Sequence, residues 1–244
     1  MIKSLPGTTG RRRIYLMRHG FVDYTSPEVI ESQDPSRATL TERGREDARA
    51  AGLALADVDF DLAICSGLKR TEQTAEIVLA QRDAPMALEV MPEFQELKSG
   101  KYMNFESPQQ LAAVMTFQFE QAGEPGATFL EGGEKFSDAM VRINTGLQTL
   151  LGRPGWATCL LVAHEVVNRL LFTSVLGAPL GASAGFEQDT GCINILDFDL
   201  VPDEDGTGVQ VERAVIKAVN LTPANFLKNG MNLRSLEAIF TQPS

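Results

Sequence analysis

The sequence predicts an α/β protein of three layers, in which helices cover both faces of a mostly parallel central sheet. Short apolar runs rich in β-branched residues, which are typical of buried strands, alternate with segments whose apolar residues recur every three or four positions, as in amphipathic helices. Near the end of the chain, strand-like segments at 190–200 and 209–219 flank the polar turn 203–206, which predicts an antiparallel hairpin.

The other strands are predicted from short apolar runs that end at turn-forming residues. Gly67 ends the second of these runs, and Pro85 and Pro92 border the third. The expected strands cover residues 14–17, 61–66, 86–90 and 158–163. Since these runs are apolar on both alternating faces, we expect them to be buried between two layers of helices.

The helices are predicted from capping residues and periodicity. Thr41 is a favourable N-cap for a helix over 42–55. Ser107 begins a capping-box sequence, Ser107-Pro108-Gln109-Gln110, which predicts a helix reaching about residue 121. The remaining helices are expected at 69–80, 135–151, 166–176 and 233–240. The polar, proline-interrupted segment 20–39 predicts a long irregular loop.

One domain is expected, because the sequence contains no linker or repeat. Residues 1–12 carry Pro6, Gly7 and Gly10 without periodicity and are expected to form a flexible tail. Residues 13–244 then form the domain, and the segment at about 101–133 is expected to be a cap-like insertion over the edge of the sheet.

Composition argues against several classes of partner. Hydrophobic residues make up 43% of the chain and charged residues 22%, as in ordinary globular proteins, and the net charge is −10. An acidic chain of this kind is not expected to bind nucleic acid or a membrane surface. With no apolar segment of membrane-spanning length and no signal peptide, we expect a cytoplasmic protein. Cys65, Cys159 and Cys192 lie in apolar runs and are expected to be buried thiols.

Chemically reactive side chains follow three of the predicted strands. The chain has two histidines: His19 follows Arg18 after the first strand, and His164 follows strand 158–163. Because open α/β sheets bind ligands at the carboxyl ends of their strands, both imidazoles are expected to open onto one crevice if the two strands are neighbours. Arg70 lies in the first turn of the helix that follows Ser66 at a third strand end.

Two guanidinium groups and two imidazoles suit a tetrahedral oxyanion better than a metal ion, because the arginine charges repel a cation and no carboxylate ligand set accompanies them. One imidazole would serve as nucleophile or base and the other as a donor. This set of residues indicates covalent phosphoryl transfer through a phosphohistidine.

The motif Arg18-His19-Gly20 after an apolar strand resembles the signature of the histidine phosphatase superfamily, also called the phosphoglycerate mutase-like family. The resemblance extends over about residues 13–200, and its strength lies in an ordered set of motifs. After Arg18-His19-Gly20 these are Leu40-Thr41-x-x-Gly44, Ser66-Gly67-Leu68-x-Arg70-Thr71-x-Gln73-Thr74-Ala75, Glu96-x-x-x-Gly100, Gly133-Glu134 before a helix, and the strand ending in His164. The resemblance implies a phosphoglycerate mutase-like fold.

The resemblance also implies a role for each matching residue. His19 would attack phosphorus, while Arg18, Arg70 and His164 would bind the phosphoryl oxygens. Glu96 would protonate the leaving alkoxide and then activate water, and no metal or organic cofactor is implied. Glu93 is a nearby competitor for the acid role, but Glu96 matches the family pattern because Gly100 follows four residues later.

Substrate recognition is where the sequence departs from the family. Phe21, Val22 and Thr25 stand where the family usually has Glu or Gln, then Thr, then Asn, so Thr25 is expected to replace the phosphate contact of that Asn only in part. Glu165 follows His164 where Gly is usual. Its carboxylate is expected to point outward, to pair with an arginine, or to contact a polar or cationic part of the substrate.

The leading hypothesis is a metal-independent phosphomonoesterase of the phosphatase branch, acting on a small phosphorylated metabolite. A phosphoglycerate mutase is the first alternative, but segment 97–133 contains only Lys98 and Lys101 as basic residues and many aromatic ones, which disfavours a sugar acid. A bisphosphatase or a phosphatase for a ring-bearing substrate remains open, as does a non-catalytic protein that binds a phosphorylated ligand. The sequence also leaves open whether the chain forms a homo-oligomer.

Overall fold

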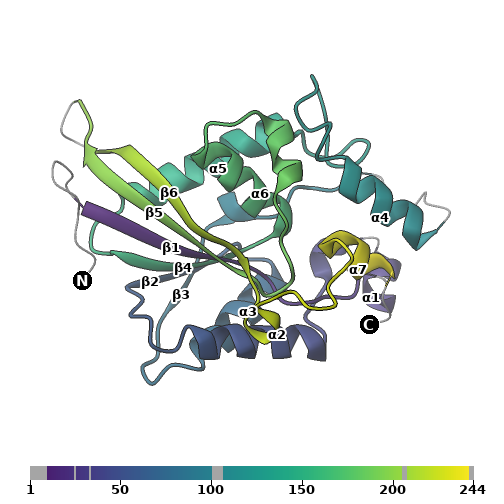
Figure 1. The fold of residues 1–244 in the computed structure, drawn as a ribbon, viewed down its shortest axis with the longest axis horizontal. Coiled ribbons are helices and arrows are strands. Elements are labelled where there is room, and N and C mark those ends of the chain that lie inside the picture. Colours follow the sequence, from purple (N-terminus) through teal and green to yellow (C-terminus); the bar gives the residue numbers. More distant parts are fainter. Residues whose placement is uncertain (1–9, 25, 33, 101–106, 205–207, 242–244) are drawn as a thin grey trace.

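A six-stranded mixed sheet forms the centre of the molecule (Figure 1). The computed structural model describes residues 10–24, 26–32, 34–100, 107–204 and 208–241. The strand order is β3-β2-β4-β1-β5-β6, in which β1, β2, β3 and β4 are parallel and β5 and β6 are antiparallel to their neighbours. The strands are β1 Gly10–Arg18, β2 Leu62–Cys65, β3 Leu88–Val90, β4 Thr158–Ala163, β5 Ile193–Pro202 and β6 Val209–Leu221.

Two pairs of helices cover the two faces of this sheet (Figure 1). Helices α2 (Glu42–Ala54) and α3 (Lys69–Leu79) lie on one face, and α5 (Phe136–Gly152) and α6 (Glu165–Val175) lie on the other. The predicted three-layer architecture with a C-terminal antiparallel hairpin is therefore confirmed.

Strand β4 shows why the apolar runs of this sequence form interior strands. All six of its residues are buried. Leu160 and Val162 pack into the core beneath α2 and α3, whereas Cys159 and Leu161 pack into the core beneath α5 and α6. Because alternate side chains of a strand point to opposite faces, a strand between two helical layers must be apolar at every position. The three cysteines are buried and free, as predicted.

Both predicted capping residues occupy the expected positions. The Thr41 hydroxyl accepts a hydrogen bond from the backbone N–H of Gly44, and the Ser107 hydroxyl accepts one from that of Gln110. Helix α4 (Pro108–Phe117) ends about four residues earlier than predicted. Its C-cap Gln118 turns its side chain back to the carbonyl of Met115 and accepts a hydrogen bond from the N–H of Leu130, which joins the helix end to a loop.

The segment 20–39 is more ordered than predicted, because it contains helix α1 (Pro27–Ser32). Val29 of this helix packs with Val22, Ala38 and Leu40 in a small apolar cluster of its own. Those four residues are scattered among polar ones, so no helical periodicity marks the segment in the sequence.

The N-terminal strand is also longer than predicted. Residues 10–12, which were assigned to the flexible tail, belong to β1. Arg11 and Arg13 pair with Asp199 and Asp197 of the adjacent antiparallel strand β5, at Nε–Oδ1 distances of 2.7 Å each. These cross-strand pairs extend the hydrogen-bonded ladder of β1 beyond its apolar run. The rest of the predicted tail, residues 1–9, lies outside the described part of the chain.

Three helices gather at one end of the sheet, beyond the carboxyl ends of the parallel strands (Figure 1). They are α1, α4 and the C-terminal helix α7 (Ser235–Thr241), and α4 packs against α7. Part of the predicted insertion 101–133, residues 101–106, lies outside the described residues. No helix in the described part of the chain is both long and apolar enough to cross a membrane.

Candidate active site

The two histidines meet at the carboxyl edge of the sheet. Strands β1 and β4 are parallel neighbours, with Arg18 paired to Ala163 in the register, so His19 and His164 leave the sheet side by side. Their ring centroids are 5.2 Å apart, and both side chains are buried. The two imidazoles converge at one edge of the sheet, as expected, but of the two only His19 lines the cavity there.

A pair of glycines allows the His19 loop to pass close to helix α2. A Cβ on Gly20 would overlap the carbonyl oxygen of Gly44, and a Cβ on Gly44 would overlap the carbonyl oxygen of Phe21. The N–H of Gly20 also donates to the Thr74 hydroxyl on α3 at 3.1 Å. The glycines of the first two motifs are thus required by backbone packing that holds His19 in place.

The hydrogen bond of His19 determines which ring nitrogen is free. Its Nδ1 lies 2.8 Å from the carbonyl oxygen of Gly20. Since a carbonyl oxygen only accepts, Nδ1 carries the proton and Nε2 keeps its lone pair. Burial, followed by the charges of Arg70 and Arg18, holds the pKa of His19 well below its usual range. The imidazole is therefore neutral at neutral pH, with Nε2 as a potential nucleophile.

His164 is oriented by a relay of hydroxyl groups. The Thr71 hydroxyl donates to the carbonyl of Leu68 at 2.7 Å, so it accepts from the Ser66 hydroxyl at 2.9 Å. The Ser66 oxygen in turn accepts from Nε2–H of His164 at 2.7 Å. Nδ1 of His164 is buried and has no hydrogen-bond partner. Sequence reasoning placed Ser66 at a strand end but missed this relay, which depends on β2 and β4 being neighbours.

The two arginines are buried and only partly satisfied by the protein. One guanidinium nitrogen of Arg18 donates to the carbonyl of Gln188, and one of Arg70 lies 3.3 Å from the carbonyls of Pro35 and Ser36. The Nε atoms of both arginines are buried without a partner. Nothing in the sequence marked Gln188 or the 35–36 backbone, because main-chain carbonyls carry no side-chain signature.

Most of the predicted residues line one cavity of about 700 Å³, namely Arg18, His19, Arg70, Glu96 and Glu165. His164 packs against His19 behind this lining, and Thr25 lies outside the described residues. Phe21 faces a different cavity, where the guanidinium of Arg43 lies 4.6 Å from its ring centroid. Within the described residues, no group of three or more His, Cys, Asp and Glu side chains is arranged to hold a metal ion.

Glu96 is the acid candidate that reaches this cavity. Its carboxylate accepts hydrogen bonds from the backbone N–H groups of Leu97 at 3.0 Å and Val166 at 3.3 Å. Burial raises the pKa of Glu96 to about 7. Glu93 does not line the cavity; its side chain packs against Gly146 of α5.

An arginine clamp holds the segment that carries Glu96. Arg142 donates to the carbonyls of Glu93 and Gln95, at 2.7 and 3.0 Å, and makes a two-pronged ion pair with Glu134 at 2.9 Å. The motif Gly133-Glu134 therefore supports the site from behind. A Cβ on Gly133 would overlap the carbonyl of Phe129, so this position also requires glycine.

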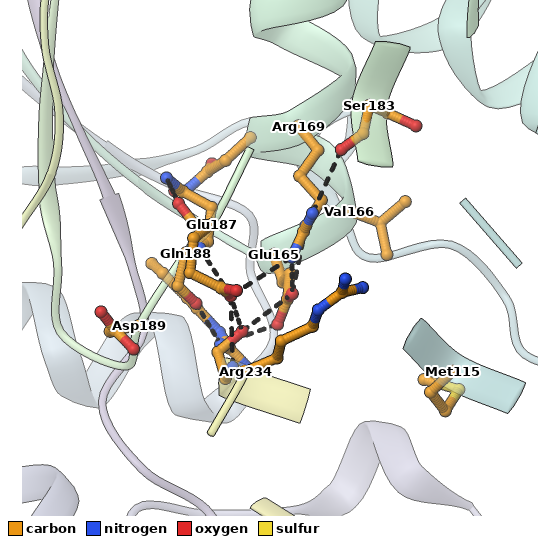
Figure 2. A network of polar contacts seen from close by, with 12 residues as sticks. Met115, Glu165, Val166, Arg169, Ser183, Glu187, Gln188, Asp189 and Arg234 are labelled. Atoms are coloured by element: carbon orange, nitrogen blue, oxygen red, sulfur yellow. Dashed lines mark hydrogen bonds and ion pairs between the residues drawn. The ribbon is translucent and has the colours of Figure 1, made fainter. Parts of the chain in front are cut away.

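Glu165 pairs with arginine, one of the three arrangements considered from the sequence. Its Oε2 lies 2.7 Å from Nη1 of Arg18, and its Oε1 lies 2.7 Å from Nη2 of Arg169. Figure 2 shows Arg169 lying between Glu165 and the backbone of Ser183. The carboxylate is buried and also faces the cavity, so it contributes negative charge beside the arginine that would contact an anion.

The chain is similar in overall sequence to several named enzymes. An adenosylcobalamin/alpha-ribazole phosphatase of Escherichia coli is 27% identical over 187 residues, which covers 77% of this chain and 90% of that protein. A probable phosphoglycerate mutase GpmB of Erwinia tasmaniensis is 26% identical over 190 residues, which covers 78% of this chain and 86% of that protein.

Solved structures share the fold. The alpha-ribazole phosphatase from Shigella flexneri superposes with a TM-score of 0.64 at 24% identity, covering 85% of this chain and 96% of that one. A structure described as mycobacterial hydrolase 1 gives a TM-score of 0.68 at 22% identity, covering 86% and 99%. A family model for branch 1 of the histidine phosphatase superfamily matches residues 14–202. This chain is therefore a member of the histidine phosphatase superfamily.

Proposed function

We propose that this protein is a phosphomonoesterase that hydrolyses a small phosphorylated metabolite through a phosphohistidine on His19. The observation that carries the proposal is the unprotonated Nε2 of His19 beside two buried guanidinium groups, each with an Nε atom that lacks a partner. A phosphoryl group would supply the missing acceptors. The names of the relatives, several of them phosphatases, support the same reaction.

In the first step, Nε2 of His19 attacks phosphorus, a P–N bond forms, and the P–O bond to the leaving alkoxide breaks. Arg18 and Arg70 donate to the non-bridging oxygens and offset their charge. Burial, followed by nearby positive charge, holds the pKa of His164 well below its usual range. The substrate dianion offsets that positive charge, so His164 takes up a proton from solvent as the substrate binds and donates it from Nδ1 to a phosphoryl oxygen. Glu96 gives its proton to the leaving oxygen.

In the second step, the Glu96 carboxylate accepts a proton from a water molecule as that water attacks phosphorus. The P–N bond breaks, inorganic phosphate leaves, and Glu96 is protonated again for the next cycle. A pKa of about 7 suits a group that must be an acid in one step and a base in the other. Neither step uses a metal or an organic cofactor, and we expect the reaction to take place in the cytoplasm.

The test is hydrolysis of an aryl phosphate by the purified protein in the presence of a chelator. We expect full activity without added metal, and loss of at least about 1,000-fold in His19→Ala, because the nucleophile is gone. Acid quench during turnover should trap a phosphoenzyme that is labile to acid and stable to base. Activity retained by correctly folded His19→Ala, or lost on chelation, would contradict the proposal.

A phosphoglycerate mutase is the second candidate, favoured by the similarity to a probable enzyme of that name. Beyond the arginine pair, Lys98 is the one other cation among the described residues that line the cavity, whereas a sugar acid brings a carboxylate in addition to its phosphate. Incubation with 3-phosphoglycerate and a bisphosphoglycerate primer distinguishes the two functions. Formation of 2-phosphoglycerate faster than release of phosphate would identify a mutase.

A further inference from the structure

The C-terminal helix α7 contributes to the active-site cavity although it lies beyond residues 14–202, which the family model matches. Leu236 of α7 lines the cavity, and α7 packs against α4, whose Met115 lines it as well. Part of the cavity lining therefore comes from a segment that follows the family-matched part of the chain.

Specific polar contacts seat α7 on the site. The hydroxyl of Ser235 lies 3.0 Å from Oε1 of Glu165 and 2.6 Å from Oε1 of Glu187, and its backbone N–H donates to the same Glu187 oxygen at 3.2 Å. Glu165 also pairs with Arg18. The carboxylate beside the arginine that would contact phosphate thus also holds the first residue of α7. Figure 2 shows Glu165 and Glu187, the two carboxylates of this contact, beside Arg169, with which both of them pair.

The cavity lining contains six apolar side chains in addition to its charged and polar groups: Leu68, Leu97, Met115, Phe129, Val166 and Leu236. All of these except Leu68 belong to one apolar cluster and form the apolar wall of the cavity. At about 700 Å³, the cavity has the size of sites that enclose a whole small molecule, far more than a phosphoryl group needs.

We infer that the alcohol released from the substrate carries an apolar or aromatic body of several carbons, seated against Met115, Phe129 and Leu236, and that α7 sets this preference. The inference rests on the proposed phosphatase function. An apolar body gains by leaving water at this wall. A second anionic group would be poorly received, because among the described lining residues Lys98 is the one cation beyond the arginine pair, and Asp34 and Glu165 add negative charge.

The first measurement compares three monoesters of primary alcohols: ethyl, hexyl and 2-phenylethyl phosphate. Their leaving groups have similar basicity, so differences in kcat/KM report contacts with the body. We expect kcat/KM for the two larger esters to exceed that for ethyl phosphate by at least about tenfold, and 3-phosphoglycerate to be a poorer substrate than ethyl phosphate. Equal values for the three esters would overturn the inference and leave the phosphatase function intact.

Two variants on the same helix test the role of α7. Leu236→Ala is expected to reduce the ratio of kcat/KM for 2-phenylethyl over ethyl phosphate severalfold. Ile239→Ala is the matched control, because it removes a buried side chain of α7 that lines the separate cavity beside Phe21 and Arg43. In this variant the ratio should be unchanged. Two outcomes would show that α7 does not select the substrate: an equal fall of the ratio in both variants, or an unchanged ratio in both.

Binding of phosphonates tests the wall without any chemistry. By calorimetry, wild-type protein is expected to bind 2-phenylethylphosphonate at least about tenfold more tightly than ethylphosphonate. If the protein shows this binding preference but hydrolyses none of the esters, the phosphatase function is refuted and the apolar binding wall is supported. Equal affinities together with hydrolysis of all three esters would refute the wall alone.

Discussion

Neutrality of the two imidazoles is the central residue-scale property of this site. Desolvation, with the charges of Arg70 and Arg18 adding to it, lowers the pKa of both His19 and His164. The same positive charges that disfavour an imidazolium favour a bound dianion. The same buried arginines therefore keep the proposed nucleophile unprotonated and attract the phosphoryl group that this nucleophile would attack.

Glu96 gives the first residue-scale prediction. Its carboxyl, raised to a pKa of about 7 by burial, stays protonated below that pH and loses its proton above it. The proposed acid is thus present at low pH, and kcat/KM for an alkyl phosphate is expected to decline above about pH 7. In Glu96→Gln this decline should disappear and the rate should be lowered, far more for alkyl than for aryl esters. A decline that persists in Glu96→Gln would assign it to another group.

Glu165 gives the second residue-scale prediction. Glu165→Gln removes a negative charge beside Arg18, so inorganic phosphate is expected to inhibit the variant at several-fold lower concentration. Arg18 loses its carboxylate partner and Arg169 keeps only the longer pair with Glu187 at 3.4 Å, so the free energy of unfolding should fall by about 3 kcal/mol. Glu46→Gln, the same change on an exposed position of α2, serves as the control and should alter neither quantity. Unchanged phosphate inhibition in Glu165→Gln would mean that Glu165 does not oppose anion binding.

Elements position the site through close backbone contacts. Helix α2 approaches the turn after β1 so closely that Gly20 and Gly44 leave no room for a Cβ. On the other side of the cavity, Arg142 of α5 holds the carbonyls around Glu96. His19 and Glu96 come from loops, but each of these loops is fixed by a neighbouring helix.

Gly44→Ala tests this element-scale packing. Because the new methyl group would overlap the carbonyl of Phe21, helix α2 and the His19 turn must separate. We expect a loss of about 1–3 kcal/mol in the free energy of unfolding, together with reduced kcat. Gly123→Ala is the matched control, since a Cβ there makes only ordinary contacts, and its stability should stay within about 0.5 kcal/mol of wild type. Equal stability of Gly44→Ala and wild type would contradict the packing argument.

At the scale of the whole molecule, one sheet supports two apolar cores, and the active site lies at the sheet's carboxyl edge between them. Strand β4 contributes to both cores, so neither face is expected to unfold without the other. The division into a single domain with a cap-like insertion, and the oligomeric state, stay predictions.

Denaturation with and without inorganic phosphate tests the single-domain prediction. We expect one cooperative transition, shifted by about 2.7 kcal/mol when phosphate is present at 100 times its dissociation constant, because the ligand binds only the folded chain. In Arg70→Met the shift should largely vanish. Two separate transitions would indicate that the cap-like insertion folds as an independent unit.

Local interactions explain what was predictable from the sequence by itself. Caps such as Thr41 and Ser107 act within three residues, and the apolar run of β4 is contiguous, so strands, helices and the order of layers follow from short-range patterns. His19 was singled out because it directly follows an apolar run, whereas Glu96 was singled out only by the resemblance of Glu96-x-x-x-Gly100 to a family motif. Helix α1 was missed because its stability comes from a cluster whose members are spread over 22–40.

Tertiary structure alone decided the surroundings of those residues. The sequence left three arrangements open for Glu165, and the choice required the positions of Arg18 and Arg169. The relay through Ser66 and the wall provided by Leu236 join segments about 70 to 170 residues apart, a separation that carries no periodicity or capping signal. Reactive groups are specified by residue type at a strand end, whereas hydrogen-bond partners and pocket walls are specified by which elements pack together.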